Sequence, residues 1–259
     1  TEVFRRDPIA LSSLEDFYVT VSVIASSGLV FVVYTRYGTT NYVVECLSDT
    51  GSLLGFDSFT GRAWASGDDI NKNSAIVSST DGNFYFAHPI GAGDEEFRIC
   101  RRSSDASVQA HIDINFSSAL KVYAGISERP SAAGLRVFAN DGGSADQFYK
   151  DFDEDMNALT GWVSMAFGSD NHYETANSSR SNSTVRVATG YAVLGKNVSG
   201  DRGIFLIDHA GAFDAEVGDD NPNSYPPIYK GPSGSLIYGG VPVTTQTAIR
   251  RMLSDGSIA

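Results

Sequence analysis

The chain has 259 residues, and its 42% hydrophobic and 11% aromatic content is enough for a sizeable buried core. The formal net charge of -12 argues against a nucleic-acid backbone or an anionic membrane surface as the main partner. No apolar run approaches the roughly 20 residues that cross a bilayer, so we expect no membrane insertion.

A unit of about fifty residues recurs five times along the sequence. Each unit contains an apolar strand, a small-residue turn, a second strand, a variable loop, a third strand and a turn rich in Asp, Gly or Ser. One further step of the same length leads from the fifth unit through both termini back to the first. The residues that precede the second strands are Gly28, Gly82, Gly134, Ser183 and Gly234.

These units predict four-stranded antiparallel sheets. We expect first strands at 17–26, 74–79, 120–126, 163–169 and 226–231, and second strands at 29–34, 84–88, 135–140, 184–189 and 235–240. Third strands are expected at 41–47, 96–102, 147–152, 203–208 and 247–253. The turns that follow, where Asp and Gly supply turn geometry, are at 48–52, 103–107, 153–157, 208–212 and 254–258.

A circular array of such units is typical of a β-propeller. We therefore expect an all-β, single-domain, five-bladed β-propeller with the first strand of each blade innermost. The ring would be closed by N-terminal residues 2–5, which complete the last blade. The expected blades are 17–58, 74–116, 120–162, 163–216, and 224–259 together with 1–6.

One segment has two readings. Residues 144–161 place Phe148, Phe152, Met156 and Leu159 at helical spacing behind a Ser144 cap. The register of the repeat instead demands strands there, and we favour strands.

The segment 233–259, "SGSLIYGG...TAIRRMLSDGSIA", resembles the delta-60 repeat, whose units contain a Gly-led apolar strand, an Arg-containing strand and a DGS turn. Residues 28–56 are a looser copy, whereas the second to fourth units replace the DGS turn. The resemblance implies a repeat protein that is secreted, surface-attached or a virion structural protein, hence an extracellular or virion location. It implies no catalytic residues.

The sequence predicts that the chain is not an enzyme. Glycoside hydrolases with five blades place carboxylates on inner strands, but the expected inner strands here contain no Asp or Glu. Of the acidic clusters, only the pairs Asp68–Asp69 and Asp219–Asp220, each before an expected inner strand, could face the mouth of the central channel. Solvated loop charge is the simpler explanation for them. No nucleophile motif or histidine pair with metal-ligand spacing is present.

Two further groups bear on cofactors and redox state. Asp151, Asp153 and Asp155 alternate in a run that offers oxygen ligands to Ca²⁺ without the full 12-residue loop, and no other cofactor is expected. Cys46 and Cys100 both fall in third strands, where equivalent positions on neighbouring blades are too far apart for a disulfide. We expect two free thiols.

Ligand-binding residues are expected on the loops that join second to third strands and one blade to the next, because variable loops on a rigid scaffold carry recognition. A flat aromatic side chain beside planar polar groups suits a sugar, because a sugar ring has an apolar face and hydroxyl groups at its edges. Alternatively, Trp64 packs between two blades and contacts no ligand. The candidate ligand-binding residues are Trp64, Asp68, Asp69, Tyr191 and Tyr225.

These features predict an acidic, carbohydrate-binding or protein-binding adhesin module, in a virion or secreted protein, that recognises surface glycans or a protein partner. A purely structural joint in a larger assembly is the alternative, and a five-bladed glycosidase is the third. Turnover lost on substitution of Asp68 or Asp219 would favour the glycosidase.

Overall fold

The computed structural model describes residues 17–24, 28–36, 40–61, 74–77, 83–90, 96–115, 121–141, 147–165, 171–172, 184–197, 202–218, 228–230, 236–240 and 248–252. All regular structure in these ranges is β-strand. Over the same residues, no helix is available to cross a membrane. The expectation of an all-β chain is therefore confirmed.

The strands form five antiparallel sheets in chain order. The first sheet contains β1 (Phe17–Ile24), β2 (Val30–Arg36), β3 (Asn41–Leu47) and β4 (Leu53–Thr60). The second contains β5 (Ser74–Val77), β6 (Phe84–Pro89), β7 (Glu96–Arg102) and β8 (Val108–Asn115). The third contains β9 (Lys121–Glu128), β10 (Leu135–Asp141), β11 (Gln147–Phe152) and β12 (Val163–Met165).

The fourth sheet contains β13 (Asn171–His172), β14 (Thr184–Arg186), β15 (Gly190–Asn197), β16 (Arg202–Asp208) and β17 (Phe213–Gly218). The short strands β13 and β14 both pair with β15, so together they make one interrupted inner strand. The fifth sheet contains β18 (Ile228–Lys230), β19 (Leu236–Gly240) and β20 (Ala248–Met252).

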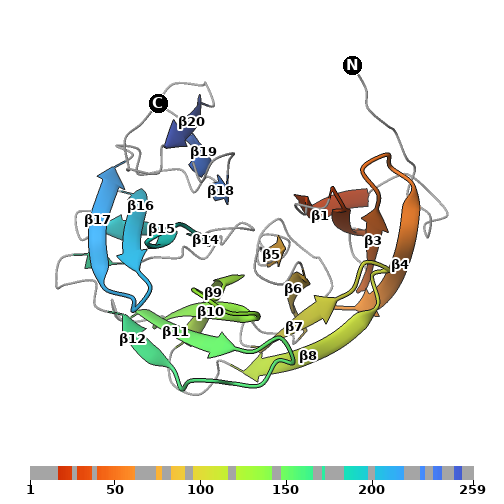
Figure 1. The fold of residues 1–259 in the computed structure, drawn as a ribbon, viewed down its shortest axis with the longest axis horizontal. Helices are drawn as coiled ribbons and strands as arrows, with labels where there is room; N and C mark the ends of the chain where they lie inside the picture. Colours follow the sequence, from red (N-terminus) through yellow and green to blue (C-terminus); the bar gives the residue numbers. More distant parts are fainter. Residues whose placement is uncertain are drawn as a thin grey trace.

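The five sheets follow one another around a common centre (Figure 1). Strands β1, β5, β9, β14 and β18 lie innermost, and each contacts the next inner strand along the chain. The described residues form an arc that is open between the fifth and first sheets, so they do not form the closed ring that we expected. The residues predicted to close it, 2–5 and the end of the chain, lie outside the described ranges.

The turns between third and fourth strands share one conformation in the first four sheets. In each, the fourth turn residue donates its N–H to the first residue's carbonyl, and the first residue's N–H bonds the fifth residue's carbonyl. The fourth residue has positive φ in every case, at Gly51, Ala106, Met156 and Gly211. This backbone favours glycine, yet Ala106 and Met156 are buried there in the core.

Apolar side chains fill the spaces between neighbouring sheets. Phe31 of the first sheet stacks on Phe84 of the second with ring centroids 4.2 Å apart. Met156 reaches from the third sheet's turn into a cluster that includes Tyr85 and Ile99 of the second sheet. Tyr149 and Tyr191 belong to the cluster between the third and fourth sheets. Packing of this kind fixes the first four sheets against one another.

Residues 147–161 contain no helix, and the strand interpretation is confirmed for Gln147–Phe152. The strand that pairs with it, Val163–Met165, lies beyond residue 161. The expectation for the fourth blade was wrong. The segment starting at Val163 pairs with β11 and ends the third sheet, and Thr184–Arg186 is an inner strand rather than a second strand. The residue equivalent to Gly134 is Gly190, not Ser183.

A close backbone approach explains this equivalence. A Cβ on Gly134 would lie 2.2 Å from the Phe152 carbonyl oxygen, and one on Gly190 would lie 1.8 Å from the Ile207 carbonyl oxygen. Both positions face the strand that ends at the next turn, and neither has room for a side chain.

Both cysteines are free and buried, as expected. They are not at equivalent positions, however, which corrects the argument for that expectation. Cys46 pairs with Gly55 opposite it, whereas Cys100 pairs with His111, one register position further from the turn.

Candidate functional site

A cavity of about 230 Å³ lies between the outer strands of the first and second sheets. Strand β4 supplies one wall, and β6, β7 and β8 supply the other. Side chains alternate between the two faces of a strand. The lining side chains of β6, β7 and β8 therefore lie side by side on one face of the second sheet. The lining residues are Asp57, Phe59, Thr60, His88, Arg98, Cys100, Arg102, Val108 and His111.

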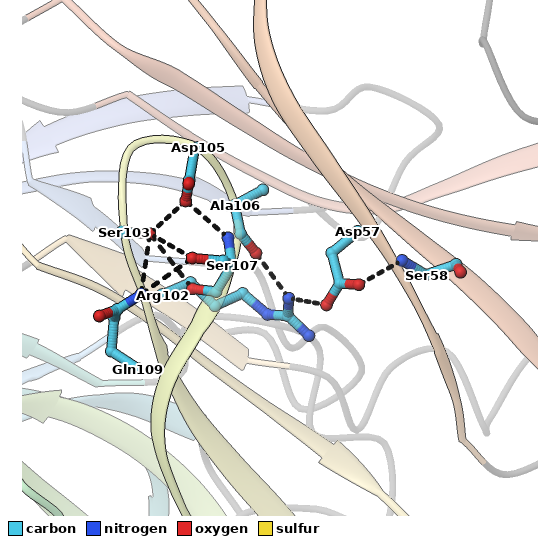
Figure 2. A network of polar contacts seen from close by, with 8 residues as sticks. All are labelled: Asp57, Ser58, Arg102, Ser103, Asp105, Ala106, Ser107 and Gln109. Carbon is cyan, nitrogen blue, oxygen red and sulfur yellow. Dashed lines mark hydrogen bonds and ion pairs between the residues drawn. The ribbon is translucent and has the colours of Figure 1, made fainter.

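The guanidinium of Arg102 is the most buried charge of this site, at 1% exposure. Its Nη1 donates to Asp57 Oδ2 at 2.5 Å and to the Ala106 carbonyl oxygen at 2.7 Å, as Figure 2 shows. The guanidinium also lies over the Phe59 ring, 5.1 Å from its centroid. Arg102 therefore ties its own turn to the outer strand of the first sheet.

The turn beside Arg102 is held by its own polar side chains (Figure 2). Asp105 accepts hydrogen bonds from the Ser103 hydroxyl and from the Ser107 N–H. Those hydrogen bonds, led by the one from Ser103, hold the pKa of the Asp105 carboxyl at about 2. The turn presents the Ala106 carbonyl to Arg102 from a fixed position.

His88 forms an aromatic wall of the cavity with Phe59, whose ring centroid is 4.6 Å away. Its Nδ1 is 3.2 Å from the Pro89 carbonyl oxygen, which assigns the proton to Nδ1. Burial lowers the pKa of His88 to about 4, and nearby Arg102 and Arg98 act in the same direction. His88 is thus neutral near pH 7 and adds no positive charge.

The two other lining groups of β7 are the Arg98 guanidinium and the Cys100 thiol. Arg98 donates Nε and Nη2 to the two oxygens of Asp113 at 2.7 and 2.8 Å, a bidentate pair. Burial raises the pKa of the Cys100 thiol, so it is protonated near pH 7 and is a poor nucleophile.

This arrangement is suited to holding a polar ligand. The one carboxylate that lines the cavity, Asp57, accepts hydrogen bonds with both oxygens, from Ser58 N–H and from Arg102. The geometry offers hydrogen-bond donors against an aromatic wall, as a ligand-binding pocket does.

The residues predicted from sequence are not brought together here. Trp64, Asp68, Asp69 and Tyr225 lie outside the described residues, as do Asp219 and Asp220. Tyr191 is fully buried, which corrects its expected place on an exposed loop. Its hydroxyl donates to the Glu128 carbonyl at 2.8 Å, and its ring packs between the third and fourth sheets.

The proposed calcium ligands do not converge either. Asp151 pairs with Arg136 through two hydrogen bonds of 2.7 and 2.9 Å. Asp153 accepts hydrogen bonds from the backbone of its own turn and from the Asn157 amide, and Asp155 faces Arg101 at 3.5 Å. Within the described ranges no group of three His, Cys, Asp or Glu side chains could hold a metal ion. The arrangement therefore gives no support to the calcium expectation at these residues.

Sequence reasoning missed the cavity because its residues come from four strands, β4, β6, β7 and β8, of two sheets. His88 and His111 lack metal-ligand spacing in the sequence, so neither gave a signal there. One signal was available: Arg98, Cys100 and Arg102 alternate along a single strand, which places three polar side chains on a face that otherwise packs against a neighbour.

Comparison of the sequence with protein families finds no match, and comparison with curated proteins finds none. The structure is similar to solved β-propeller proteins. TolB from Acinetobacter baumannii has 14% identity and a TM-score of 0.53, and the match covers 88% of this chain and 50% of that one. Kuenenia stuttgartiensis hydrazine synthase has 12% identity and a TM-score of 0.51, covering 97% and 69%.

Prolyl oligopeptidase B from Galerina marginata has 10% identity and a TM-score of 0.49, covering 97% of this chain. The chain spans 43% and 50% of the lengths of this peptidase and of TolB. At such identities the likeness shows the fold alone, a propeller-type module.

The comparisons correct the expectation that the chain is not an enzyme. The hydrazine synthase, whose match has a TM-score of 0.51, is an enzyme. Since an enzyme shares this fold, an all-β repeat architecture gives no ground for excluding catalysis.

Proposed function

We propose that this chain is a binding module built on a five-bladed β-propeller, which recognises a glycan or a protein partner through the loops at one end of its sheets. The proposal includes closure of the ring by residues 2–5 and a delta-60-type secreted or virion setting. The loops in question join second to third strands and each sheet to the next.

A difference between the two ends of the sheets supports this proposal. At one end, the third-to-fourth turns share one backbone conformation in four sheets. At the other end, the connections differ in length and sequence from sheet to sheet. Those between sheets span 61–73, 116–120, 166–183 and 219–227, with β13 inside the third of them. Variation at one end of a repeat scaffold is typical of a binding face.

Contacts between sheets would hold these loops in fixed relative positions. Arg186 of the fourth sheet donates to Glu128 of the third at 3.0 Å. Arg136 of the third sheet donates to the carbonyl of His209, in the turn of the fourth, at 2.7 Å. A scaffold locked in this way lowers the entropy cost of presenting a composite binding surface.

The test is a glycan array probed with the intact protein and with Trp64→Ala, using Ser104→Ala as the matched control. Ser104 is exposed in a turn at the opposite end of the second sheet. We expect saturable binding that Trp64→Ala weakens about tenfold or more through lost stacking area and that Ser104→Ala leaves intact.

Loss of binding in Ser104→Ala alone would place the ligand at the wrong end and refute the proposal. Absence of glycan binding, together with a multi-copy assembly that buries the loop end, would favour the structural-joint alternative. Release of shortened glycan from the array would identify catalysis at the same face.

A further inference from the structure

We propose that β4, the outer strand of the first sheet, is a self-association surface that pairs antiparallel with β4 of a second copy of this chain. The contact would extend the first sheet across a twofold axis. The inference concerns the outer circumference of the molecule, where Figure 1 shows β4, and it does not depend on the loop end. It rests on exposed apolar side chains and on unused backbone groups along one edge.

Strand β4 carries two large apolar side chains at the surface. Leu54 is 48% exposed and Phe56 is 51% exposed. Asp57 of the same strand faces the second sheet, where it accepts a hydrogen bond from Arg102. Because side chains alternate along a strand, Leu54 and Phe56 lie on the opposite face. The exposed residues of that face, called here the outer row, are Leu54, Phe56, Ser58 and Thr60.

Closure of the ring by the fifth sheet would leave the outer row exposed. The turns 48–52 and 103–107 have the same hydrogen bonds, so Phe56 of the first sheet corresponds to His111 of the second. His111 lines the cavity between these two sheets and is exposed although the first sheet is in place. A fifth sheet packed in the same way against the first would therefore leave Phe56 at the surface.

The other outer strands that the structure describes have features that disfavour pairing. Strand β8 carries the exposed Asp113, β17 contains Asp214 and Glu216, and β12 has only three residues. Charged residues and short strands are common protections of a sheet edge. Strand β4 has eight residues, and its outer row contains no charge. In a chain with a net charge of -12, an uncharged edge lets two copies approach with little repulsion.

The backbone of β4 has unused groups along its outer edge. Gly61, just after the strand, donates its N–H to the Thr40 carbonyl, just before β3. Hydrogen-bonded pairs alternate along an antiparallel ladder, and the register is regular from Gly55 to the end of β4. Phe56 therefore directs its N–H and C=O groups away from β3. Among the described residues, no hydrogen bond uses them.

A hydrogen bond within β4 selects the register of the pair. Asp57 Oδ1 accepts from the Ser58 N–H at 2.9 Å, so an axis at Ser58 would lose both central hydrogen bonds. An axis at Phe56 keeps them, because each Phe56 donates its N–H to the carbonyl of the other. This axis also places the two Phe56 rings beside each other, and it places Leu54 opposite Ser58 of the second copy. Aromatic pairs across strands stabilise such sheets.

Sedimentation velocity of the intact protein from about 5 to about 500 μM tests for association. A single strand from each copy makes a contact below the roughly 1,200 Å² of a standard interface, so we expect a weak dimer. The weight-average sedimentation coefficient should rise with concentration toward the value of a dimer.

Two lysine variants locate the contact. Phe56→Lys places like charges opposite each other at the axis and should raise the Kd of the dimer about tenfold or more. Leu159→Lys is the matched control, because Leu159 is 50% exposed at the position of the third sheet equivalent to Leu54. Its N–H is bonded to the Asp151 carbonyl, and it lies outside β12. Leu159→Lys should leave the Kd within about twofold.

Two cysteine variants test the register. Residues that face each other in a hydrogen-bonded pair have Cα atoms about 5.5 Å apart, within the range of a disulfide. Under mild oxidation, Phe56→Cys should form covalent dimers about fivefold or more faster than Leu159→Cys at the same concentration. The native Cys46 and Cys100 are buried, so they do not compete.

If Phe56→Lys does not fold, the two cysteine variants decide. A monomer at every concentration would overturn the proposal and would leave the outer row to another segment of this chain or to a strand of another protein. Equal effects of Phe56→Lys and Leu159→Lys on the Kd would also overturn it. So would equal rates of crosslinking for Phe56→Cys and Leu159→Cys.

Discussion

Substitution of Gly55 by alanine probes the contact between the first and second sheets. Gly55 lies on β4, opposite the turn of the second sheet. A Cβ there would lie 2.1 Å from the Asp105 carbonyl oxygen and 2.6 Å from its Cα. These are backbone atoms of a turn braced by Ser103 and Ser107, so they cannot move aside as a flexible side chain would.

The expected cost follows from two opposing effects. Overpacking of a well-packed interface costs about 1–3 kcal/mol, and an overlap with backbone belongs at the upper end. Replacing glycine gains about 0.4–1 kcal/mol by restricting the unfolded chain. Gly55→Ala should therefore destabilise the protein by about 1–2.5 kcal/mol, which for a chain of this size lowers Tm by about 2–10 °C.

Gly161→Ala is the matched control, because a Cβ there would meet nothing within 4 Å and the residue is exposed. Thermal and urea unfolding followed by circular dichroism should show Gly161→Ala equal to or above wild type and Gly55→Ala below it. If Gly55→Ala melts with the wild type, the turn of the second sheet does not rest on β4, and the placement of the cavity fails with it.

Three more predictions concern buried groups. The pKa of His88 is lowered to about 4 from 6.5, so the unfolded chain binds the proton more tightly. Stability should be fully present above pH 6.5 and fall as the pH drops to 4, by on the order of 3 kcal/mol more in wild type than in His88→Phe, measured by urea unfolding. Met156→Ala should cost about 2–5 kcal/mol, whereas Met156→Gly should cost less than Met156→Ala because φ is 65° there. Burial raises the pKa of Cys46 to about 11 and raises that of Cys100, so neither thiol should react with a disulfide reagent at neutral pH until the protein unfolds.

Local sequence patterns were enough to predict most of the strands. The third strands, and the turns that follow the first four of them, were placed correctly because each combines an apolar run with a turn whose residues favour one geometry. β3 and β7 each end where Ser48 or Ser103 begins the turn. These signals are contained within a hairpin, so they need no knowledge of distant packing.

The fourth sheet was misread because its inner strand is interrupted. Residues 173–183 separate β13 from β14, and this insertion breaks the spacing that the alignment relied on. Gly190 was the informative residue, since a backbone carbonyl occupies the space where its side chain would be. That contact involves Ile207, so it cannot be recognised from the spacing of glycines alone.

Tyr191 shows why the candidate ligand residues were harder to identify. An aromatic residue with a hydroxyl next to a glycine-containing turn suits both a ligand contact and a core position that satisfies a backbone carbonyl. Here its hydroxyl bonds Glu128 and its ring lies 5.1 Å from the Arg136 guanidinium. Both partners belong to another sheet, and only the packing of the two sheets distinguishes the alternatives.

Arginine side chains bridge three successive interfaces between sheets. They differ in which nitrogens of the guanidinium have a partner. Arg101 of the second sheet faces Glu154 and Asp155 in the turn of the third sheet. Arg136 of the third sheet donates Nη1 to the His209 carbonyl in the turn of the fourth sheet. The Nε and Nη2 of Arg136 donate to Asp151 of its own sheet. Arg102 uses Nη1 for the contact between sheets, as Arg136 does, but no carboxylate of its own sheet occupies the other edge. The aspartate that completes the third sheet's arrangement has no counterpart at Arg102, whose buried Nε has no hydrogen-bond partner among the described residues.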